Sequence, residues 1–478
     1  MEQAEGYTSL ARLSNKYLIL KYNHCTEVCM DRITVDFSKN CGVVKPMHSV
    51  NNGPVYKFAA DQRVTNIHHY RAAGIPYART HDASFCSTYG GEHIVDVNMI
   101  FTDWSKDATD PASYDFTLTD EYLRMIEAGG AKVYYRLGTK IEHWSKKYNT
   151  LPPADFHKWA VVCEHIIRHY TEGWADGYRM DIEYWEIWNE PDLDPDDSPH
   201  KRCWGGTAKQ FYEFYCVAHK HLKACFPHLK IGGPACARFY EDWLCGFFDE
   251  LKRQEIVPDF FSWHIYAATV EEEQERIRDV RGILDKYGFT ETESILNEWN
   301  YAKGWEGDEW IYTLKTEKGL KGSSFIAATM CMAQYENVDN LMFYDARPCA
   351  MNSLFNTDFI FECLKGYYPF YMFNQLYTQG TAVPVERESR DVWAAAAVGE
   401  EQNVMLSYYT DDDSAADKTV AISLKGIKND GAARLECYLL DETHDAALVH
   451  SEIVTGDSVE LELAMPKWST YLVKLLKA

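Results

Sequence analysis

Eight short apolar runs, each followed by a helical pattern, occupy the chain from about Cys41 to Arg347. This alternation is typical of buried parallel strands joined by helices, and it predicts an α/β fold, a (β/α)8 TIM barrel. The expected strands are Gly42–Val50, Tyr77–His81, Lys132–Leu137, Glu183–Asn189, Lys230–Gly233, Phe260–Tyr266, Ser294–Glu298 and Asn340–Tyr344. The expected helices are Asp61–Ala73, Thr119–Ala128, Ala154–His169, Ala208–Cys225, Tyr240–Gln254, Val270–Tyr287, Ser323–Asn337 and a last one at Tyr367–Leu376.

An open doubly wound sheet is the alternative arrangement for such a pattern. That fold is expected to carry a glycine-rich phosphate loop after its first strand. Here the first strand runs into Asn51, Asn52, Gly53 and Pro54, which do not form such a loop. The barrel is therefore the favoured architecture.

The pattern changes beyond the barrel. Short alternating segments separated by Gly, Asp and Asn turns, such as Asn429-Asp430-Gly431, predict an accessory antiparallel β-sandwich. We expect the strand-like run Leu18–Asp36 to join this sandwich, which gives domains at 1–40, 41–378 and 379–478. Its expected strands are Val392–Val398, Val404–Tyr409, Thr419–Leu424, Leu435–Leu440, Val459–Leu463 and Thr470–Leu475.

The charge balance excludes several classes of partner. The chain has 72 acidic and 48 basic residues, which gives a formal net charge of −24. Such a surface repels nucleic acids and anionic membranes. Aromatic residues make up 14% of the chain, which suits either a sugar-binding cleft or a large aromatic core.

The sequence also predicts where the protein works. Met1–Ser14 is polar and mixed in charge, so we expect no signal peptide. No apolar run approaches the roughly 20 residues that a membrane-spanning helix needs. The 14 cysteines form no C-x-x-C pair and no zinc-finger spacing, so we expect reduced thiols, no metal and a cytoplasmic location.

Two expected strands end in the same dipeptide. The fourth ends in Asn189-Glu190 and the seventh in Asn297-Glu298. The carboxyl ends of barrel strands open on the active-site face, so the two glutamates can face each other across the mouth. Glycoside cleavage needs such a pair, one as proton donor and one as nucleophile or base. For a single glutamate, an ion pair at the rim is the simpler alternative.

The segments Trp188-Asn189-Glu190-Pro191 and Asn297-Glu298-Trp299 resemble the clan A retaining glycoside hydrolases. Within that clan the chain is most similar to glycoside hydrolase family 39, whose members include β-xylosidases, with α-L-iduronidase as a relative. Arg79-Thr80-His81 and the run Asp259–Tyr266 add to the resemblance.

The resemblance implies roles for particular residues. Glu190 would be the general acid and then the general base, and Glu298 the nucleophile that forms a glycosyl ester. Asn189 would hydrogen-bond the sugar 2-hydroxyl. Tyr266 would donate a hydrogen bond to Glu298, and Arg79 would favour the charged form of that carboxylate.

Further side chains are candidate substrate contacts. His81 and His264 would contact sugar hydroxyls or the catalytic carboxylates, although a lone histidine on a strand is more often structural. Trp299 and Trp305 are either sugar platforms or core residues, and Asn52 follows the first strand at the same face. No cofactor or metal is implied, and the expected partner is an oligosaccharide or glycoside, with a homo-oligomer as an option that the resemblance suggests.

The eighth strand departs from the β-xylosidases because it ends in Asp345, Ala346 and Arg347. Arg347 could face a substrate carboxylate or hydroxyls, or pair with Asp345. The expected activity is a retaining exo-glycoside hydrolase for β-xylosidic or similar bonds. A different glycone (galactoside, glucoside or arabinoside), a transglycosidase and an inactive carbohydrate-binding barrel are the alternatives.

Overall fold

The structure, a computed structural model, describes residues 31–59, 62–82, 93–351, 353–428 and 432–478. The chain divides into two compact units. One contains Lys45–Gly322 and Ala333–Asn374, and the other contains Met1–Val44, Ser323–Met332 and Gln375–Ala478. The domain limits expected from the sequence stay a prediction. The turn Asn429-Asp430-Gly431 and the part of the expected strand Leu18–Asp36 before Asp31 lie outside the described residues.

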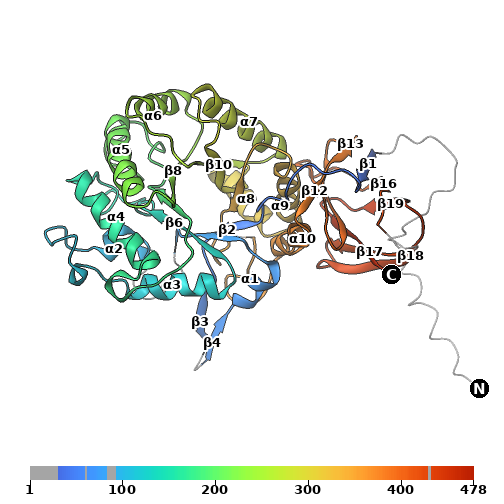
Figure 1. The fold of residues 1–478 in the computed structure, drawn as a ribbon. Helices are drawn as coiled ribbons and strands as arrows, with labels where there is room; N and C mark the ends of the chain where they lie inside the picture. The colour runs from blue at the N-terminus through green and yellow to red at the C-terminus, as the bar shows by residue number, and fades with distance from the viewer. Residues whose placement is uncertain (1–30, 60–61, 83–92, 352, 429–431) are drawn as a thin grey trace, which may run out of the picture. The chain divides into compact units, whose positions relative to one another are not determined.

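The larger unit holds a closed barrel of eight parallel strands, in the order β10-β11-β2-β5-β6-β7-β8-β9 (Figure 1). The TIM-barrel prediction is confirmed, and each barrel strand falls on or next to an expected run. The strands are β2 (Ser49–Asn51), β5 (Tyr77–Arg79), β6 (Lys132–Leu137), β7 (Tyr184–Ile187), β8 (Lys230–Cys236), β9 (Phe260–Ala267), β10 (Glu293–Tyr301) and β11 (Asn340–Phe343).

Helices surround these strands in Figure 1. They are α1 (Ile67–Ala73), α2 (Val97–Ile100), α3 (Thr117–Ala128), α4 (Phe156–Thr171), α5 (Ala208–Cys225), α6 (Glu241–Arg253), α7 (Val270–Lys286) and α8 (Gly307–Glu317). Two further helices, α9 (Leu320–Ala333) and α10 (Tyr368–Tyr377), each have residues in both units. Among the described residues, no helix is at once long and apolar enough to cross a bilayer.

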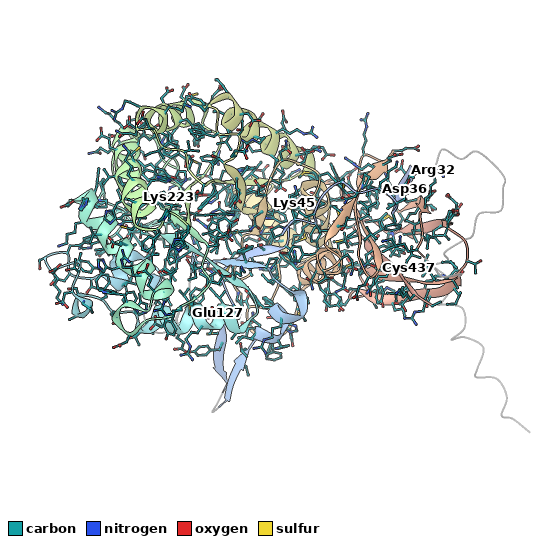
Figure 2. All side chains as sticks on the ribbon, viewed as in Figure 1. Arg32, Asp36, Lys45, Glu127, Lys223 and Cys437 are labelled. Atoms are coloured by element: carbon teal, nitrogen blue, oxygen red, sulfur yellow. The ribbon has the colours of Figure 1, made fainter. Side chains whose placement is uncertain are left out.

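Helix α5 shows how local sequence sets these elements. Thr207 precedes it, and the Thr207 side chain accepts a hydrogen bond from the Gln210 backbone N–H at 3.2 Å. In return, the Gln210 side chain accepts one from the Thr207 N–H at 3.0 Å. This capping box satisfies two backbone donors at the helix start. At the other end, Lys223 lies 2.7 Å from Asp259, the residue before β9 (Figure 2).

One local prediction is wrong in part. Within the expected helix Asp61–Ala73, β4 (Gln62–Thr65) is a strand that pairs with β3 (Tyr56–Ala59), and only Ile67–Ala73 is helical. Val64 and Thr65 are β-branched, which favours a strand, and the pairing with β3 overrides helical spacing there. Helix α8 lies in a segment where no element is expected from the sequence.

The smaller unit is a sandwich of two sheets. One has the order β13-β1-β16-β19 and the other β12-β14-β15-β20-β17-β18. Both contribute to one apolar core, which includes Ile33, Ile422, Leu435 and Cys437 (Figure 2). Strand β1 does join this unit, but it pairs with β16 in parallel, so the sandwich is not antiparallel throughout. The strands are β1 (Asp31–Asp36), β12 (Thr381–Val383), β13 (Val385–Arg387), β14 (Val392–Val398), β15 (Gln402–Tyr408), β16 (Lys418–Lys425), β17 (Ala433–Leu440), β18 (Ala447–Val454), β19 (Ser458–Met465) and β20 (Thr470–Lys477).

The barrel interior changes from apolar to polar along its strands. A layer of Tyr134, Tyr184, Phe260, Ile295 and Met342 packs together near the strand starts. Side chains two residues apart on a strand share a face. Each of these strands therefore sends later residues into the interior above that layer, where polar side chains meet.

Candidate active site

The turn after β7 places Glu190. Trp188 and Glu190 have φ values of +78° and +48°, in the left-handed region that side-chain-bearing residues rarely adopt. The Glu190 backbone N–H donates to the Ala235 carbonyl at 2.9 Å, which holds the turn against β8. Gly138 lies against this turn, and a Cβ there would lie 3.0 Å from the Trp188 Cα. Strained backbone of this kind concentrates at functional sites.

A bulge in β10 places Glu298. The register between β10 and β9 shifts between Leu296 and Glu298. Such a bulge puts two consecutive side chains on one face. Asn297 accordingly donates to Glu186 inside the barrel, and Glu298 contacts the interior Arg79. Trp299 then points away from the barrel interior.

The Glu298 carboxylate is surrounded by donors. Arg79 Nη1 donates to Oε1 at 2.8 Å, and the Tyr266 hydroxyl donates to Oε2 at 2.9 Å. His81 Nε2 lies 3.2 Å from Oε1. Burial and the neighbouring Glu298 raise the pKa of Tyr266 well above its ordinary value, so the phenol keeps its proton and remains a donor. These contacts orient the Glu298 carboxylate and give each of its oxygens a hydrogen-bond donor.

Arg79 lies beneath the site, is 0% exposed, and contacts several of the site residues. Besides Glu298, its Nε donates to Glu186 Oε2 at 2.7 Å and its Nη2 to Asn189 Oδ1 at 2.7 Å. Burial opposes its charge, but the carboxylates of Glu186 and Glu298 outweigh burial and raise the pKa of Arg79. The guanidinium therefore stays cationic next to Glu298.

Glu190 has a different environment. His264 Nδ1 lies 2.9 Å from Oε1, and the Cys203 thiol donates to Oε2 at 3.7 Å. Burial raises the pKa of Glu190, although the charges of His81 and Arg79 oppose that shift. Burial also lowers the pKa of His264 to about 4, against the pull of Glu298. Burial thus disfavours the charged form of both Glu190 and His264.

The two carboxylates face each other. Glu190, His264 and Glu298 each place one nitrogen or oxygen atom within 4.8 Å of the other two. This set has the spacing of metal ligands, but both Glu298 oxygens already accept hydrogen bonds, one from Arg79 and the other from Tyr266. A buried carboxyl whose pKa is raised, beside a carboxylate that accepts hydrogen bonds from Arg79 and Tyr266, matches the division of labour in a glycosidase, where one carboxyl is the acid and the other the nucleophile.

The two asparagines of the prediction have different surroundings. Asn189 Oδ1 accepts from Arg79, which fixes the amide and leaves its N–H groups as the donors. Asn52 instead accepts a hydrogen bond from the Asp82 backbone N–H at 2.6 Å and is 1% exposed. Asn52 therefore supports the loop that begins at Asp82.

A second charged group, which we call the Asp82 group, adjoins His81. Asp82 lies 3.1 Å from His81 Nδ1, 3.1 Å from Lys140 Nζ and 3.3 Å from Arg347 Nη2. Arg347 also lies 3.2 Å from Asp345, so the expected alternative of an Asp345–Arg347 pair is present. Burial raises the pKa of Asp345 to about 6, although Arg347 opposes that shift.

The two candidate tryptophans, Trp299 and Trp305, differ in exposure and position. Trp299 is 0% exposed and packs edge-on against Phe343, so its predicted sugar contact is corrected to a core position on the outer face of β10. Trp305 is 46% exposed and packs edge-on against Tyr266, with ring centroids 5.1 Å apart. Trp305, Tyr266 and His264 line a cavity of about 550 Å³.

Sequence reasoning missed three contributors to the site. Glu186 lies in the barrel interior against Arg79. The spacing of two from Tyr184 is the signal that could have found it. Cys203 and Asp82 come from loops, whose course no local pattern indicates.

The comparisons with known proteins agree with this architecture. Residues 66–293 match the model of Glycosyl hydrolases family 39. A β-xylosidase from Geobacillus stearothermophilus is 28% identical over 168 residues, which are 32% of this chain and 31% of that protein. A β-xylosidase from Caldicellulosiruptor saccharolyticus is 29% identical over 166 residues, with 32% and 31% covered. The matched segment thus spans about a third of these relatives.

Solved structures show the same fold over nearly the whole chain. A glucosidase from Croceicoccus marinus superposes with a TM-score of 0.75 at 23% identity, covering 94% of this chain and 99% of that one. A monomeric β-xylosidase from Caulobacter crescentus CB15 superposes with a TM-score of 0.69 at 16% identity, covering 93% and 99%. Over residues 66–293, the chain is thus similar to glycoside hydrolase family 39, and its fold is that of the solved structures.

Proposed function

We propose that the protein is a retaining exo-glycoside hydrolase that cleaves β-xylosidic or similar bonds by double displacement. The observation that carries this proposal is the pair Glu190 and Glu298, with oxygens within 4.8 Å of each other and opposite environments. Retaining enzymes hold their carboxyls about 5–5.5 Å apart, whereas inverting enzymes need about 6.5–9.5 Å to admit a water molecule. The short separation supports retention.

In the first step, Glu298 attacks the anomeric carbon while Glu190 gives its proton to the departing glycosidic oxygen. Arg79 and Tyr266 keep the Glu298 carboxylate charged and aimed, at 2.8 and 2.9 Å. The amide N–H groups of Asn189 donate to the sugar 2-hydroxyl, a contact that strengthens in the transition state. The glycosyl ester on Glu298 results.

In the second step, Glu190 takes a proton from water, and the water oxygen attacks the anomeric carbon and releases Glu298. The ester has removed the negative charge that stood near Glu190. Loss of a neighbouring anion favours the ionised form of a carboxyl, so Glu190 can now act as a base. Two displacements at one carbon retain its configuration.

The glycone of this reaction is a pentose or hexose in the β configuration. The two relatives named as β-xylosidases support xylose first. The Croceicoccus marinus glucosidase supports glucose as the second candidate. Initial rates on aryl β-xyloside, β-glucoside, β-galactoside and α-arabinoside, with NMR of the first-formed anomer, decide between them.

The test of the mechanism is Glu298→Gly with and without azide. The variant should lose turnover, and azide should restore part of it by entering the vacated face and forming a glycosyl azide of inverted configuration. Glu293→Gln is the matched control, because Glu293 lies on the same strand but pairs with Lys230 at 2.6 Å at the far end. Wild-type turnover in Glu298→Gly would refute the proposal.

The protein is further proposed to act in the cytoplasm, without a cofactor, on an oligosaccharide or glycoside. Among the described residues, the cysteines are free thiols, as expected in a reducing compartment. A homo-oligomer is part of the same proposal. Cell fractionation and light scattering test the location and the assembly.

A further inference from the structure

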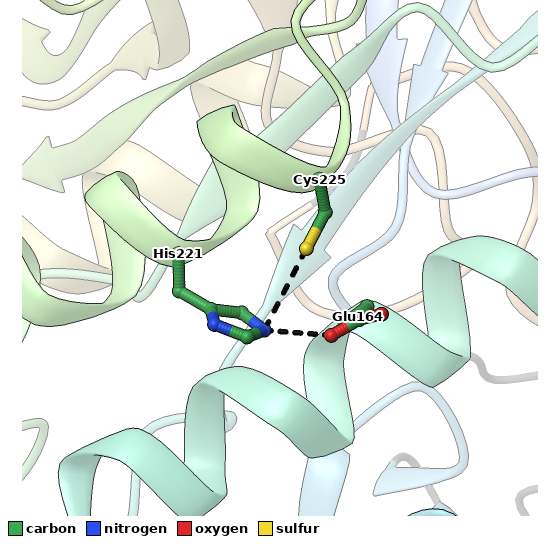
Figure 3. Close-up of side chains that lie close together, drawn as sticks. All are labelled: Glu164, His221 and Cys225. Atoms are coloured by element: carbon green, nitrogen blue, oxygen red, sulfur yellow. Dashed lines mark hydrogen bonds and ion pairs between the residues drawn. The ribbon is translucent and has the colours of Figure 1, made fainter.

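Helices α4 and α5 bring together three side chains outside the candidate active site. Glu164 comes from α4, and His221 and Cys225 come from α5 (Figure 3). Residues four apart on a helix lie on one face, one above the other, so His221 and Cys225 both face α4. Figure 3 shows that one ring nitrogen of His221 contacts both the Cys225 thiol and the Glu164 carboxylate.

The possible ligand atoms of these three side chains lie close together. His221 Nε2 lies 2.7 Å from Glu164 Oε2 and 3.8 Å from Cys225 Sγ, and all three donors lie within 4.8 Å of one another. Zinc binds nitrogen and oxygen at about 2.0–2.2 Å and thiolate sulfur at about 2.3 Å, in a tetrahedron. Two such ligands then lie about 3.3–3.7 Å apart, so small side-chain rotations would admit the ion.

The surroundings fit a ligand set. Arg168 Nε donates to Glu164 Oε1 at 2.8 Å, which orients the carboxylate and leaves Oε2 toward His221. Hydrogen bonds to a ligating carboxylate are the usual outer support of metal sites. The fourth position of a tetrahedron would be left to water, because the cluster supplies three ligand atoms.

We infer that Glu164, His221 and Cys225 form a binding site for a thiophilic divalent cation of the Zn²⁺ class. An imidazole and a thiolate select zinc or cobalt over magnesium or calcium, which prefer oxygen. The ion would replace the thiol proton, join α4 to α5 on the outside of the barrel and stabilise that pair of helices. The competing arrangement is the same network without an ion, in which Glu164 pairs with His221 and Arg168 and the Cys225 thiol contacts His221.

The test uses the full chain after treatment with a chelator. Zinc affinity is measured by competition with a chromophoric chelator, and Co²⁺ is added to a second sample for its absorption spectrum. The site predicts one equivalent of tightly bound Zn²⁺, a thermal midpoint raised by several degrees, and a sulfur-to-cobalt charge-transfer band. Mg²⁺ should give none of these effects.

Two variants and a matched control make the assignment specific. Cys225→Ser and His221→Gln should each weaken Zn²⁺ binding at least tenfold, and Cys225→Ser should abolish the charge-transfer band. Cys245→Ser on α6 is the control and should change neither. Glycosidase activity should stay unchanged in Cys225→Ser, because the cluster lies outside the active site. Absence of stoichiometric Zn²⁺ binding, or binding that survives Cys225→Ser, would overturn the site; circular dichroism verifies that each variant is folded.

Discussion

Arg79 and Glu186 form a fully buried ion pair inside the barrel, with Nε 2.7 Å from Oε2 and neither side chain exposed. The same guanidinium reaches Glu298 at 2.8 Å. A buried charge is tolerated only when it is paired and hydrogen-bonded. The pair therefore fixes the guanidinium at the position from which it orients the proposed nucleophile.

Arg79→Met should destabilise the fold and abolish turnover. The variant leaves Glu186 and Glu298 buried without their cation, which costs about 3–5 kcal/mol for a broken buried pair. Urea unfolding and kcat/KM measure the two effects. The double variant Arg79→Met/Glu186→Gln should recover stability but not activity. An unchanged free energy of unfolding in Arg79→Met would show that the Arg79–Glu186 pair does not stabilise the barrel interior.

Glu190→Ala should slow the cleavage of substrates with poor leaving groups far more than that of substrates with good ones. Removal of a general acid lowers the rate by about 10²–10⁴-fold when the departing oxygen needs a proton. A dinitrophenyl glycoside needs none, so its first step should stay fast. Steady-state rates on both substrates measure the difference, with Glu183→Gln at the base of the barrel as control. Equal losses on the two substrates would contradict the assignment of Glu190 as the acid.

The Cys203 thiol should tune the general acid. It donates to Glu190 Oε2 at 3.7 Å, and this bond opposes the rise in the pKa of Glu190 that burial causes. Cys203→Ala should move the basic limb of the pH profile of kcat/KM up by about half a unit, and Cys203→Ser, a stronger donor, should move it down. A role in packing alone would change the rate without moving the limb.

His264 should make stability depend on pH. Burial lowers its pKa from 6.5 to about 4 in the folded protein, so the unfolded chain binds the proton first as the pH falls. The stability from neutral His264 is fully present above pH 6.5 and is lost as the pH falls toward about 4, up to about 3 kcal/mol. Urea unfolding at several pH values should show that the free energy of unfolding falls less steeply with falling pH in His264→Asn than in the wild type. An identical dependence of the unfolding free energy on pH in the two proteins would contradict this role of His264.

The barrel could be predicted because eight apolar runs alternate with helical patterns, and the first run is not followed by the glycine-rich loop of a doubly wound sheet. The strand-end rule then places Glu190 and Glu298 on one face without any knowledge of their contacts. The helix at Ala208–Cys225 matches its prediction to the residue, since Thr207 and Gln210 mark its start.

The remaining features depend on tertiary contacts. The bulge in β10 lets both Asn297 and Glu298 face the barrel interior. Trp299 therefore faces outward and lies in the core, which simple alternation along the strand does not predict. Cys203 reaches Glu190 from a loop, and β1 joins β16 in parallel across most of the chain. Neither periodicity nor propensity encodes such long-range pairings.

Trapping the covalent intermediate tests the central claim most directly. The protein is incubated with a 2-deoxy-2-fluoro β-glycoside that carries an activated leaving group, which slows hydrolysis of the ester, and its peptides are then analysed by mass spectrometry. We predict one fluoroglycosyl group per chain, on Glu298. A label on another residue, or turnover with inversion and no label, would contradict the account.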